Sequence, residues 1–149
     1  MDSIDREILA FLHEDGRATM TEVAHKVGLS LSACHRRFRD LEGAGVIRGF
    51  RADLDFELLG LPFEALVFVT MQAADFASWS AFEDAVAAMP NIVQAHRLFG
   101  EPDYQLYIAV RSKQHFQEIY DQQLTQLPGV QRLTSTLIMK TVVAGRAPI

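Results

Sequence analysis

Four polar side chains recur at helical spacing between residues 30 and 40, in a segment rich in arginine. They stand at positions i, i+3, i+4 and i+7, which share one face of an α-helix: Ser32, His35, Arg36 and Arg39. Such side chains reach the phosphates or base edges of DNA, and arginine makes a bidentate contact to guanine. The alternative is a solvated charged face on a helical bundle, but the charged side chains of this face are all positive before Asp40. The pattern therefore favours a DNA-reading surface.

The formal net charge of −5 does not contradict this prediction, because the charge is unevenly distributed. Residues 1–51 contain eight Lys and Arg and eight Asp and Glu, so the whole negative net charge lies in residues 52–149. Residues 30–51 alone hold five arginines against Asp40 and Glu42. Phosphates respond to nearby charge while distant charge is screened, so an acidic protein with one basic face can bind DNA.

Three short helices are expected to position this face. The first begins after Asp2, and the second spans 20–27, where Thr19 and Glu22 form a capping box. The third begins after Ser30, and Gly28 allows the sharp turn before it. The positions expected to face inward are Ile4, Ile8, Phe11 and Leu12, then Val23, Ala24 and Val27, then Leu31, Cys34, Phe38 and Leu41. Two helices joined by a three-residue turn have the spacing of a helix-turn-helix.

The rest of the chain alternates between strand and helix patterns, after a β-prone stretch at 46–54 that predicts either a wing or an extended hinge. The expected elements are strand 63–72, helix 77–89, strand 92–99, strand 104–110, helix 113–127 and strand 130–143. The order βαββαβ is that of the ferredoxin-like fold. We therefore expect an α+β protein, with a (winged) helix-turn-helix domain at 1–50, a hinge strand and linker at 51–62, and a ferredoxin-like effector domain at 63–149.

One face of the predicted sheet is too apolar to meet solvent. In a ferredoxin-like fold both helices cover the same face of the sheet and leave the other bare. On the bare face the sequence places Leu66, Phe68 and Tyr107. A second copy of the sheet is the simplest cover, so we expect a homodimer whose symmetry matches a pseudo-palindromic site in double-stranded DNA.

Several classes of protein and site are not expected. No apolar run approaches the ~20 residues needed to cross a bilayer, and the first residues are acidic where a signal peptide is basic. We therefore expect a cytoplasmic protein. Cys34 is the only cysteine, and its inward position indicates a packed core thiol. The histidines are scattered and no nucleophile–base pair or phosphate-binding loop is found, so we expect no metal, no cofactor and no enzyme activity.

Short motifs follow one another in a specific order along nearly the whole chain. They are Asp2-x-Ile4-Asp5-Arg6-x-Ile8-Leu9, Asp15-Gly16-Arg17, Val27-Gly28-Leu29-Ser30, Cys34-x-x-Arg37, Leu41-Glu42-x-x-Gly45-x-Ile47, Gly100-x-x-Asp103-Tyr104 and Leu127-Pro128-Gly129-Val130. This series resembles the Lrp/AsnC family, the leucine-responsive or feast-famine regulators. The resemblance implies a bacterial or archaeal transcription factor that forms dimers, often octamers, and senses a small amino acid or related metabolite.

The resemblance also implies an effector site between dimers, near the loop at 100–104 and the last strand. There a carboxylate can bind the α-ammonium group of an amino acid, and loop N–H groups can bind its α-carboxylate. Hydroxyl groups can supply the remaining hydrogen bonds. The alternative is that 100–103 is only a hairpin turn, which uses the same residue types. The candidate effector-binding residues are Leu98, Gly100, Glu101, Pro102, Asp103, Tyr104, Thr134, Ser135 and Thr136.

The DNA contacts are expected from the helix-turn-helix and the segment after it. The candidates are Thr19, Ser30, Ser32, Ala33, His35, Arg36, Arg37, Arg39 and Arg48. Leu31 stands where family members often have proline, and His35 where they have an aliphatic or aromatic residue. His35 is therefore a base contact, a phosphate contact or a plain surface histidine.

Two other functions are compatible with the same motifs. Some proteins that resemble this family are sirohaem decarboxylases, and His96 with Arg97 would be the candidates for holding a tetrapyrrole. The acidic second domain disfavours a polycarboxylate substrate. The other alternative is a DNA-compacting protein without a specific effector.

Overall fold

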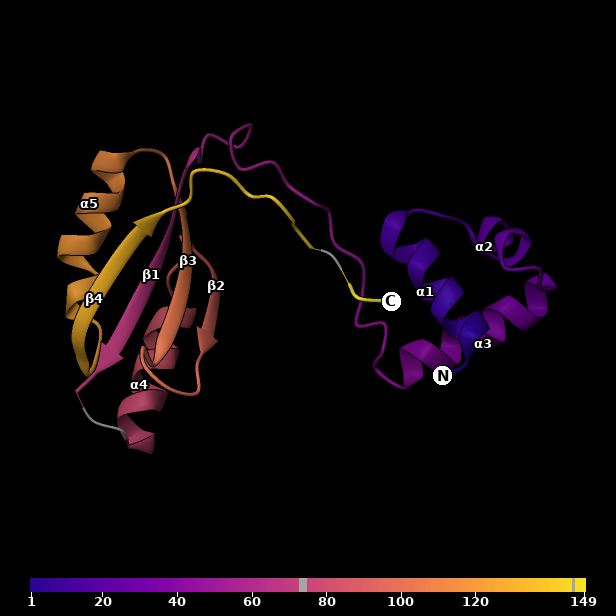
Figure 1. Ribbon diagram of the computed structural model, residues 1–149, viewed down its shortest axis with the longest axis horizontal. Helices are drawn as coiled ribbons and strands as arrows, with labels where there is room; N and C mark the ends of the chain where they lie inside the picture. The colour runs from indigo at the N-terminus through magenta and orange to yellow at the C-terminus, as the bar shows by residue number, and fades with distance from the viewer. Residues whose placement is uncertain (73–74, 146) are drawn as a thin grey trace. The chain divides into compact units, whose positions relative to one another are not determined.

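The computed structural model describes residues 1–72, 75–145 and 147–149 (Figure 1). The chain divides into two units, each with its own hydrophobic core. The helical unit consists of Met1–Asp53 with Val143–Ile149, and the sheet unit of Leu54–Val142. Within the helical unit, the Ala147 backbone N–H donates to His13 Nε2 at 3.1 Å. None of the described helices is long and apolar enough to cross a membrane.

The helical unit contains the three predicted helices, α1 (Ser3–Glu14), α2 (Met20–Lys26) and α3 (Leu31–Gly43) (Figure 1). Each helix begins at a polar residue whose side chain accepts the backbone N–H three residues on, which satisfies one of the free donors at a helix start. These capping residues are Asp2, Thr19 and Ser30. Between α2 and α3 the chain turns at Gly28, which has a φ of 69°. The helix-turn-helix prediction is therefore confirmed.

The core of the helical unit contains one residue or more from each helix. Ile8, Val23 and Cys34 are fully buried, and Leu41 is nearly so. The inward placement predicted for Leu31 is wrong, because this side chain is 46% exposed. Leu31 is the first residue of α3, and Leu29 from the preceding turn packs against the core instead.

The segment between α3 and the sheet contains no strand over residues 44–62. The hinge strand predicted within 51–62 is therefore wrong. An extended segment becomes a strand only when another strand pairs with its backbone, and none of the described strands pairs with this one. The segment ends in a turn at 56–60, where the Leu61 backbone N–H donates to the Phe56 carbonyl oxygen at 2.7 Å.

The sheet unit has the predicted βαββαβ order. The elements are β1 (Phe63–Met71), α4 (Phe76–Ala87), β2 (Ile92–Arg97), β3 (Tyr104–Val110), α5 (Lys113–Gln122), the 3₁₀ turn η1 (Leu124–Gln126) and β4 (Val130–Leu137) (Figure 1). The strands lie in the order β2-β3-β1-β4, and all neighbours are antiparallel. This is the ferredoxin-like arrangement. The last strand ends at Leu137 rather than 143, since its pairing with β1 ends at the Ala65–Leu137 pair.

The two faces of the sheet differ. On one face, Val67, Leu106 and Ile108 are fully buried beneath Phe82 of α4 and Ile119 of α5, so both helices cover the same side. The residues between them in sequence point to the other side, which we call the free face. By strand register the free face includes Glu64, Leu66, Phe68 and Thr70 of β1, Gln105 and Tyr107 of β3, and Arg132, Thr134 and Thr136 of β4.

Candidate functional site

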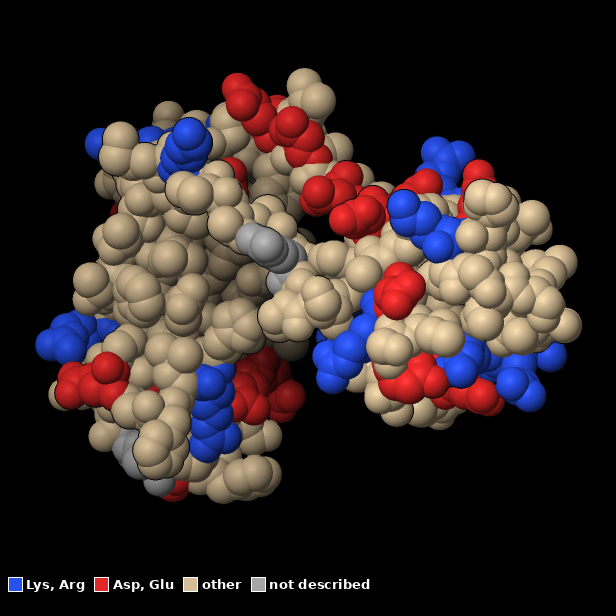
Figure 2. Space-filling view, turned by 45° about the vertical axis from the view of Figure 1, so that its right-hand side comes forward, with Lys and Arg blue, Asp and Glu red and all other residues tan. Residues whose placement is uncertain are grey.

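The outer face of α3 carries a shallow groove of about 420 Å³. The residues that line it are all exposed: Ser32, His35, Arg36, Arg39 and Asp40. The helical spacing thus brings the four predicted polar side chains to one surface. Arg36 and Arg39 make no ion pair with any described residue, so both guanidinium groups are available to an anion. Figure 2 shows Lys and Arg side chains at several places on the helical unit, interspersed with acidic ones.

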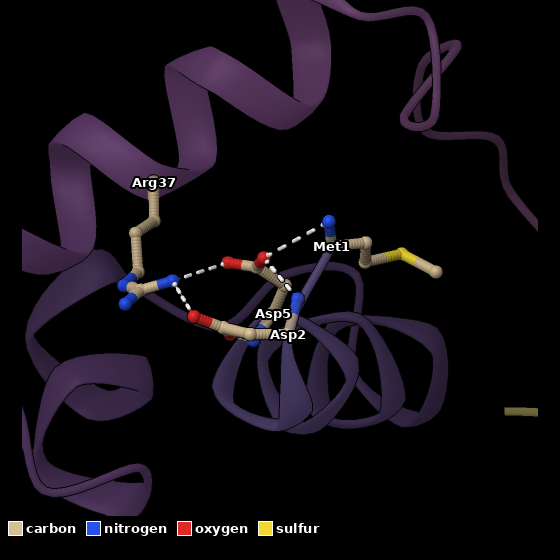
Figure 3. A network of polar contacts seen from close by, with 4 residues as sticks. All are labelled: Met1, Asp2, Asp5 and Arg37. Atoms are coloured by element: carbon tan, nitrogen blue, oxygen red, sulfur yellow. Dashed lines mark hydrogen bonds and ion pairs between the residues drawn. The ribbon is translucent and has the colours of Figure 1, made fainter.

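Arg37 is oriented differently from its neighbours. Its Nη1 donates to Asp2 Oδ2 at 2.8 Å and to Asp5 Oδ1 at 2.7 Å, so it connects α3 to the start of α1 (Figure 3). Hydrogen bonds from the Asp5 backbone N–H and, to a smaller extent, from the Arg37 guanidinium lower the pKa of the Asp2 carboxyl. Arg37 does not line the groove. The structure therefore gives it an intramolecular partner that the sequence prediction did not include.

Three of the predicted DNA contacts lie at the starts of helices: Thr19, Ser30 and Ala33. The Thr19 hydroxyl donates to Glu22 Oε2 at 2.8 Å, and the Glu22 backbone N–H donates to that hydroxyl. The Ala33 backbone N–H donates to the Ser30 hydroxyl at 3.3 Å. Both hydroxyls are therefore used in capping α2 and α3. Arg48, the last predicted DNA contact, is exposed in the segment after α3.

The predicted effector loop is bonded to the sheet as a hairpin turn. The Asp103 carboxylate accepts the Met71 backbone N–H at 2.7 Å, and the Asp103 backbone N–H donates to the Val69 carbonyl oxygen at 2.9 Å. The Leu98 backbone N–H donates to the Asp103 carbonyl oxygen at 2.7 Å. Gly100 has a φ of 124°, which favours glycine. The hairpin alternative thus accounts for Asp103, whose carboxylate already has a backbone partner.

Tyr104 and Ser135 point away from the free face. Tyr104 is only 2% exposed, and its hydroxyl donates to Glu83 Oε1 at 2.7 Å. Burial, with Glu83 nearby, raises the pKa of Tyr104 to about 12. Ser135 pairs with Val67 and so shares the helix-covered side of the sheet. Neither side chain lies on the free face with the other predicted effector-binding residues of these strands, because successive residues of a strand face opposite sides.

A pocket of about 460 Å³ lies on the free face beside the hairpin. Its lining residues are Phe68, Thr70, Glu101, Pro102, Arg132 and Thr134. Arg132 Nη2 donates to Glu101 Oε1 at 3.1 Å, and both side chains are mostly exposed. Glu101, Pro102 and Thr134 were predicted, while Phe68, Thr70 and Arg132 were missed. The alternation of β1 and β4 was the signal that could have identified them.

The tetrapyrrole alternative gains no support from the geometry. His96 pairs with Gln105 and lies on the free-face side, whereas Arg97 pairs with Tyr104 on the covered side. The Arg97 guanidinium stacks 3.6 Å from the Trp79 ring and lies 3.6 Å from Glu83 Oε1. The two residues are therefore not brought together in one site.

Comparison with known proteins gives a separate matching domain for each of the two units. Residues 64–148 match the Lrp/AsnC ligand-binding domain, and residues 1–48 match a winged helix-turn-helix DNA-binding domain. The chain is 36% identical to the leucine-responsive regulatory protein of Rhizobium meliloti, over 95% of this chain and 91% of the relative. It is 33% identical to the Bkd operon transcriptional regulator of Pseudomonas aeruginosa, over 99% and 97% of the two chains.

A solved structure shows the same architecture. The transcriptional regulator of Neisseria meningitidis in complex with L-Met aligns with a TM-score of 0.91 and 31% identity, over 96% of this chain and 92% of that one. The matched domains together extend over nearly the whole chain, and the named relatives regulate transcription. The protein therefore belongs to the Lrp/AsnC family of transcriptional regulators.

Proposed function

We propose that this protein binds double-stranded DNA through the groove on α3, and that a small amino acid or related metabolite in the free-face pocket changes its DNA affinity or assembly. The observation that carries the proposal is the exposed pair Arg36 and Arg39 on the second helix of a helix-turn-helix, with no carboxylate partner among the described residues. A helix presenting free guanidinium groups is suited to phosphates and guanine edges.

The positions along α3 suggest different roles for its side chains. In a helix-turn-helix, residues near the start of the second helix contact base edges. Ser32, His35 and Arg36 lie in the first half of α3, so we assign them to base contacts. Arg39 lies one turn further on, and we assign it to the DNA backbone. Arg48, exposed beyond α3, is a second candidate for a phosphate contact.

The free-face pocket has the charges that an amino-acid zwitterion needs. Arg132 can bind the α-carboxylate and Glu101 the α-ammonium group, because each would exchange its present partner for a ligand group of the same charge. The Phe68 ring and the Thr134 hydroxyl offer an apolar and a polar contact for the ligand's side chain. The solved relative that contains L-Met supports an amino acid as the ligand class.

The apolar part of the free face suggests how copies of the chain assemble. Leu66, Phe68 and Tyr107 are only partly buried within one chain. A second copy would cover them and form a homodimer matched to a pseudo-palindromic operator, and dimers would assemble further, in an octamer. An amino acid that binds one assembly more tightly than another would then shift the population of the tighter-binding form.

DNA binding is tested with a labelled duplex from the region upstream of the protein's own gene. We expect saturable binding that weakens steeply with salt, and one or a few of the twenty amino acids should shift the dissociation constant. Binding at one promoter without any shift would remove the amino-acid effector and retain the regulator. Binding to every duplex with equal affinity would indicate DNA compaction, and no binding at low salt would reject the DNA assignment.

A further inference from the structure

Arg37 lies on α3 between two arginines of the groove, but its guanidinium extends to the start of α1 (Figure 3). There it reaches the carboxylates of Asp2 and Asp5 at 2.8 and 2.7 Å. The Arg37 side chain is 26% exposed, whereas Arg36 and Arg39 are exposed along the groove. We call Arg37, Asp2 and Asp5 the α1–α3 clamp.

Each carboxylate of the clamp makes two kinds of contact. Asp2 Oδ1 accepts the Asp5 backbone N–H at 2.9 Å, and Asp5 Oδ2 accepts the Asp2 backbone N–H at 2.8 Å. These two bonds cap α1. The remaining oxygen of each carboxylate, Asp2 Oδ2 and Asp5 Oδ1, accepts from Arg37. The helix start therefore holds both carboxylates independently of Arg37, and their positions fix where the guanidinium can lie.

The charges of the clamp also argue against a DNA contact by Arg37. The Arg37 guanidinium and the Met1 ammonium group, which lies 4.0 Å from Asp5 Oδ2, are matched by two carboxylates, so the cluster has no net positive charge to offer a phosphate. The Asp5 backbone N–H and Arg37 keep the pKa of Asp2 below its usual value, so Asp2 is ionised at neutral pH. The Nη1 atom of Arg37 is occupied by both carboxylates, so this atom could contact DNA only if both ion pairs broke.

The clamp is in a position to control the groove. Arg36 and Arg37 are adjacent on α3, so a rotation of α3 that breaks the clamp also turns Arg36 and Arg39. Charge-assisted hydrogen bonds add geometric specificity, and Arg37 makes two of them between α3 and the start of α1. We propose that Arg37 is a positioning residue: it holds α3 against α1 so that Arg36 and Arg39 face DNA, without contacting DNA itself. This inference rests on the proposed DNA-binding function.

Neutralising the two carboxylates separates positioning from contact, because the two roles predict opposite changes. In Asp2→Asn/Asp5→Asn the amide oxygens still cap α1, while Arg37 loses its charged partners. If Arg37 positions α3, the dissociation constant for the upstream duplex rises about tenfold, the size of one charge-assisted hydrogen bond, at an unchanged salt slope. If Arg37 is a phosphate contact held back by the aspartates, the double variant binds more tightly and its salt slope steepens by about 0.9 for each added contact.

The matched control is Glu7→Gln/Glu14→Gln, which removes two acidic charges from the same helix. Glu7 and Glu14 are exposed and make no ion pair with a described residue, so this variant measures the general effect of two fewer negative charges. Arg37→Lys keeps a cation that can reach a carboxylate and should restore part of the affinity lost in Arg37→Gln. An effect on folding alone would lower the melting temperature and leave the affinity of the folded fraction unchanged.

The outcomes distinguish this inference from the proposed function. Tighter binding by the aspartate double variant than by Glu7→Gln/Glu14→Gln, or a lower salt slope in Arg37→Gln, overturns the positioning role while DNA binding stands. If Arg36→Ala and Arg39→Ala also bind like the unchanged protein, the DNA-binding assignment itself fails. Should Arg37→Gln not fold, the aspartate double variant still decides the question.

Discussion

The groove on α3 and the pocket on the free face are built in different ways. All five residues of the groove come from nine consecutive positions of one helix. The pocket takes its residues from β1, β4 and the hairpin between β2 and β3, up to 66 positions apart in the chain, from Phe68 to Thr134. The groove therefore depends on one helix being formed and oriented. The pocket depends on the register of three segments, so changes in the sheet alter it without any change in its own residues.

The largest expected effect is on the groove. In Arg36→Ala/Arg39→Ala we expect the DNA dissociation constant to rise about a hundredfold, because a base contact by Arg36 contributes about 1–3 kcal/mol and a charge-assisted phosphate contact by Arg39 about 1.5–3 kcal/mol. The melting temperature should not change, because both side chains are exposed. Fluorescence anisotropy with the upstream duplex measures the affinity. Arg111→Ala, an exposed arginine of the sheet unit, is the control and should bind as before; an unchanged affinity in the double variant would show that the groove does not read DNA.

A smaller effect is expected in the pocket. Arg132→Gln removes the group assigned to the α-carboxylate, so the amino-acid concentration that shifts DNA affinity should rise about tenfold, the equivalent of one charge-assisted contact. DNA affinity without the amino acid should stay the same. Gln131→Ala changes the preceding residue, which is exposed and does not line the pocket, and serves as the control. Equal amino-acid responses in Arg132→Gln and Gln131→Ala would exclude Arg132 from the site.

The hairpin beside the pocket can be tested through Asp103. Asp103→Ala leaves the Met71 backbone N–H without its acceptor and should lower the free energy of unfolding by about 1 kcal/mol. Asp103→Asn retains an oxygen acceptor and should lose less. Urea unfolding measures both variants. If Asn and Ala destabilise the protein equally, the hydrogen bond from Met71 is not the reason for an aspartate at this position.

The smallest expected effect concerns acid stability of the helical unit. Backbone hydrogen bonds lower the pKa values of Asp2 and Glu22 from about 3.8 and 4.5. A carboxyl with a lowered pKa in the folded state stabilises the fold above its unfolded-state pKa, and this contribution disappears as the pH falls through the folded-state pKa. The melting temperature should therefore decline below about pH 4.5. The decline should be shallower in Asp2→Asn and Glu22→Gln, and equally steep curves would exclude both carboxyls as its source.

The contrast between groove and pocket also explains which parts could be predicted. Helix caps depend on residues three apart, so Asp2, Thr19 and Ser30 could be identified directly from the sequence. The strand pattern was sufficient for the βαββαβ order. The partners of Arg37 lie 35 and 32 residues away, and no local rule relates them. Arg132 was missed because its place beside Glu101 results from the pairing of β4 with β1, whereas Tyr104 and Ser135 were assigned by proximity in sequence without regard to which face they take.

The single cysteine of the chain has a practical consequence. Cys34 is fully buried on the inner side of α3, and burial raises the pKa of its thiol. A thiol-specific reagent can then react only when α3 separates from α1 and α2, so the labelling rate reports the free energy of that local opening. Because a ligand that binds only the closed form reduces the open population, bound DNA should slow the labelling of a residue that it never touches. The helical unit thus contains a chemical reporter of its own integrity, on the side of α3 opposite to the groove.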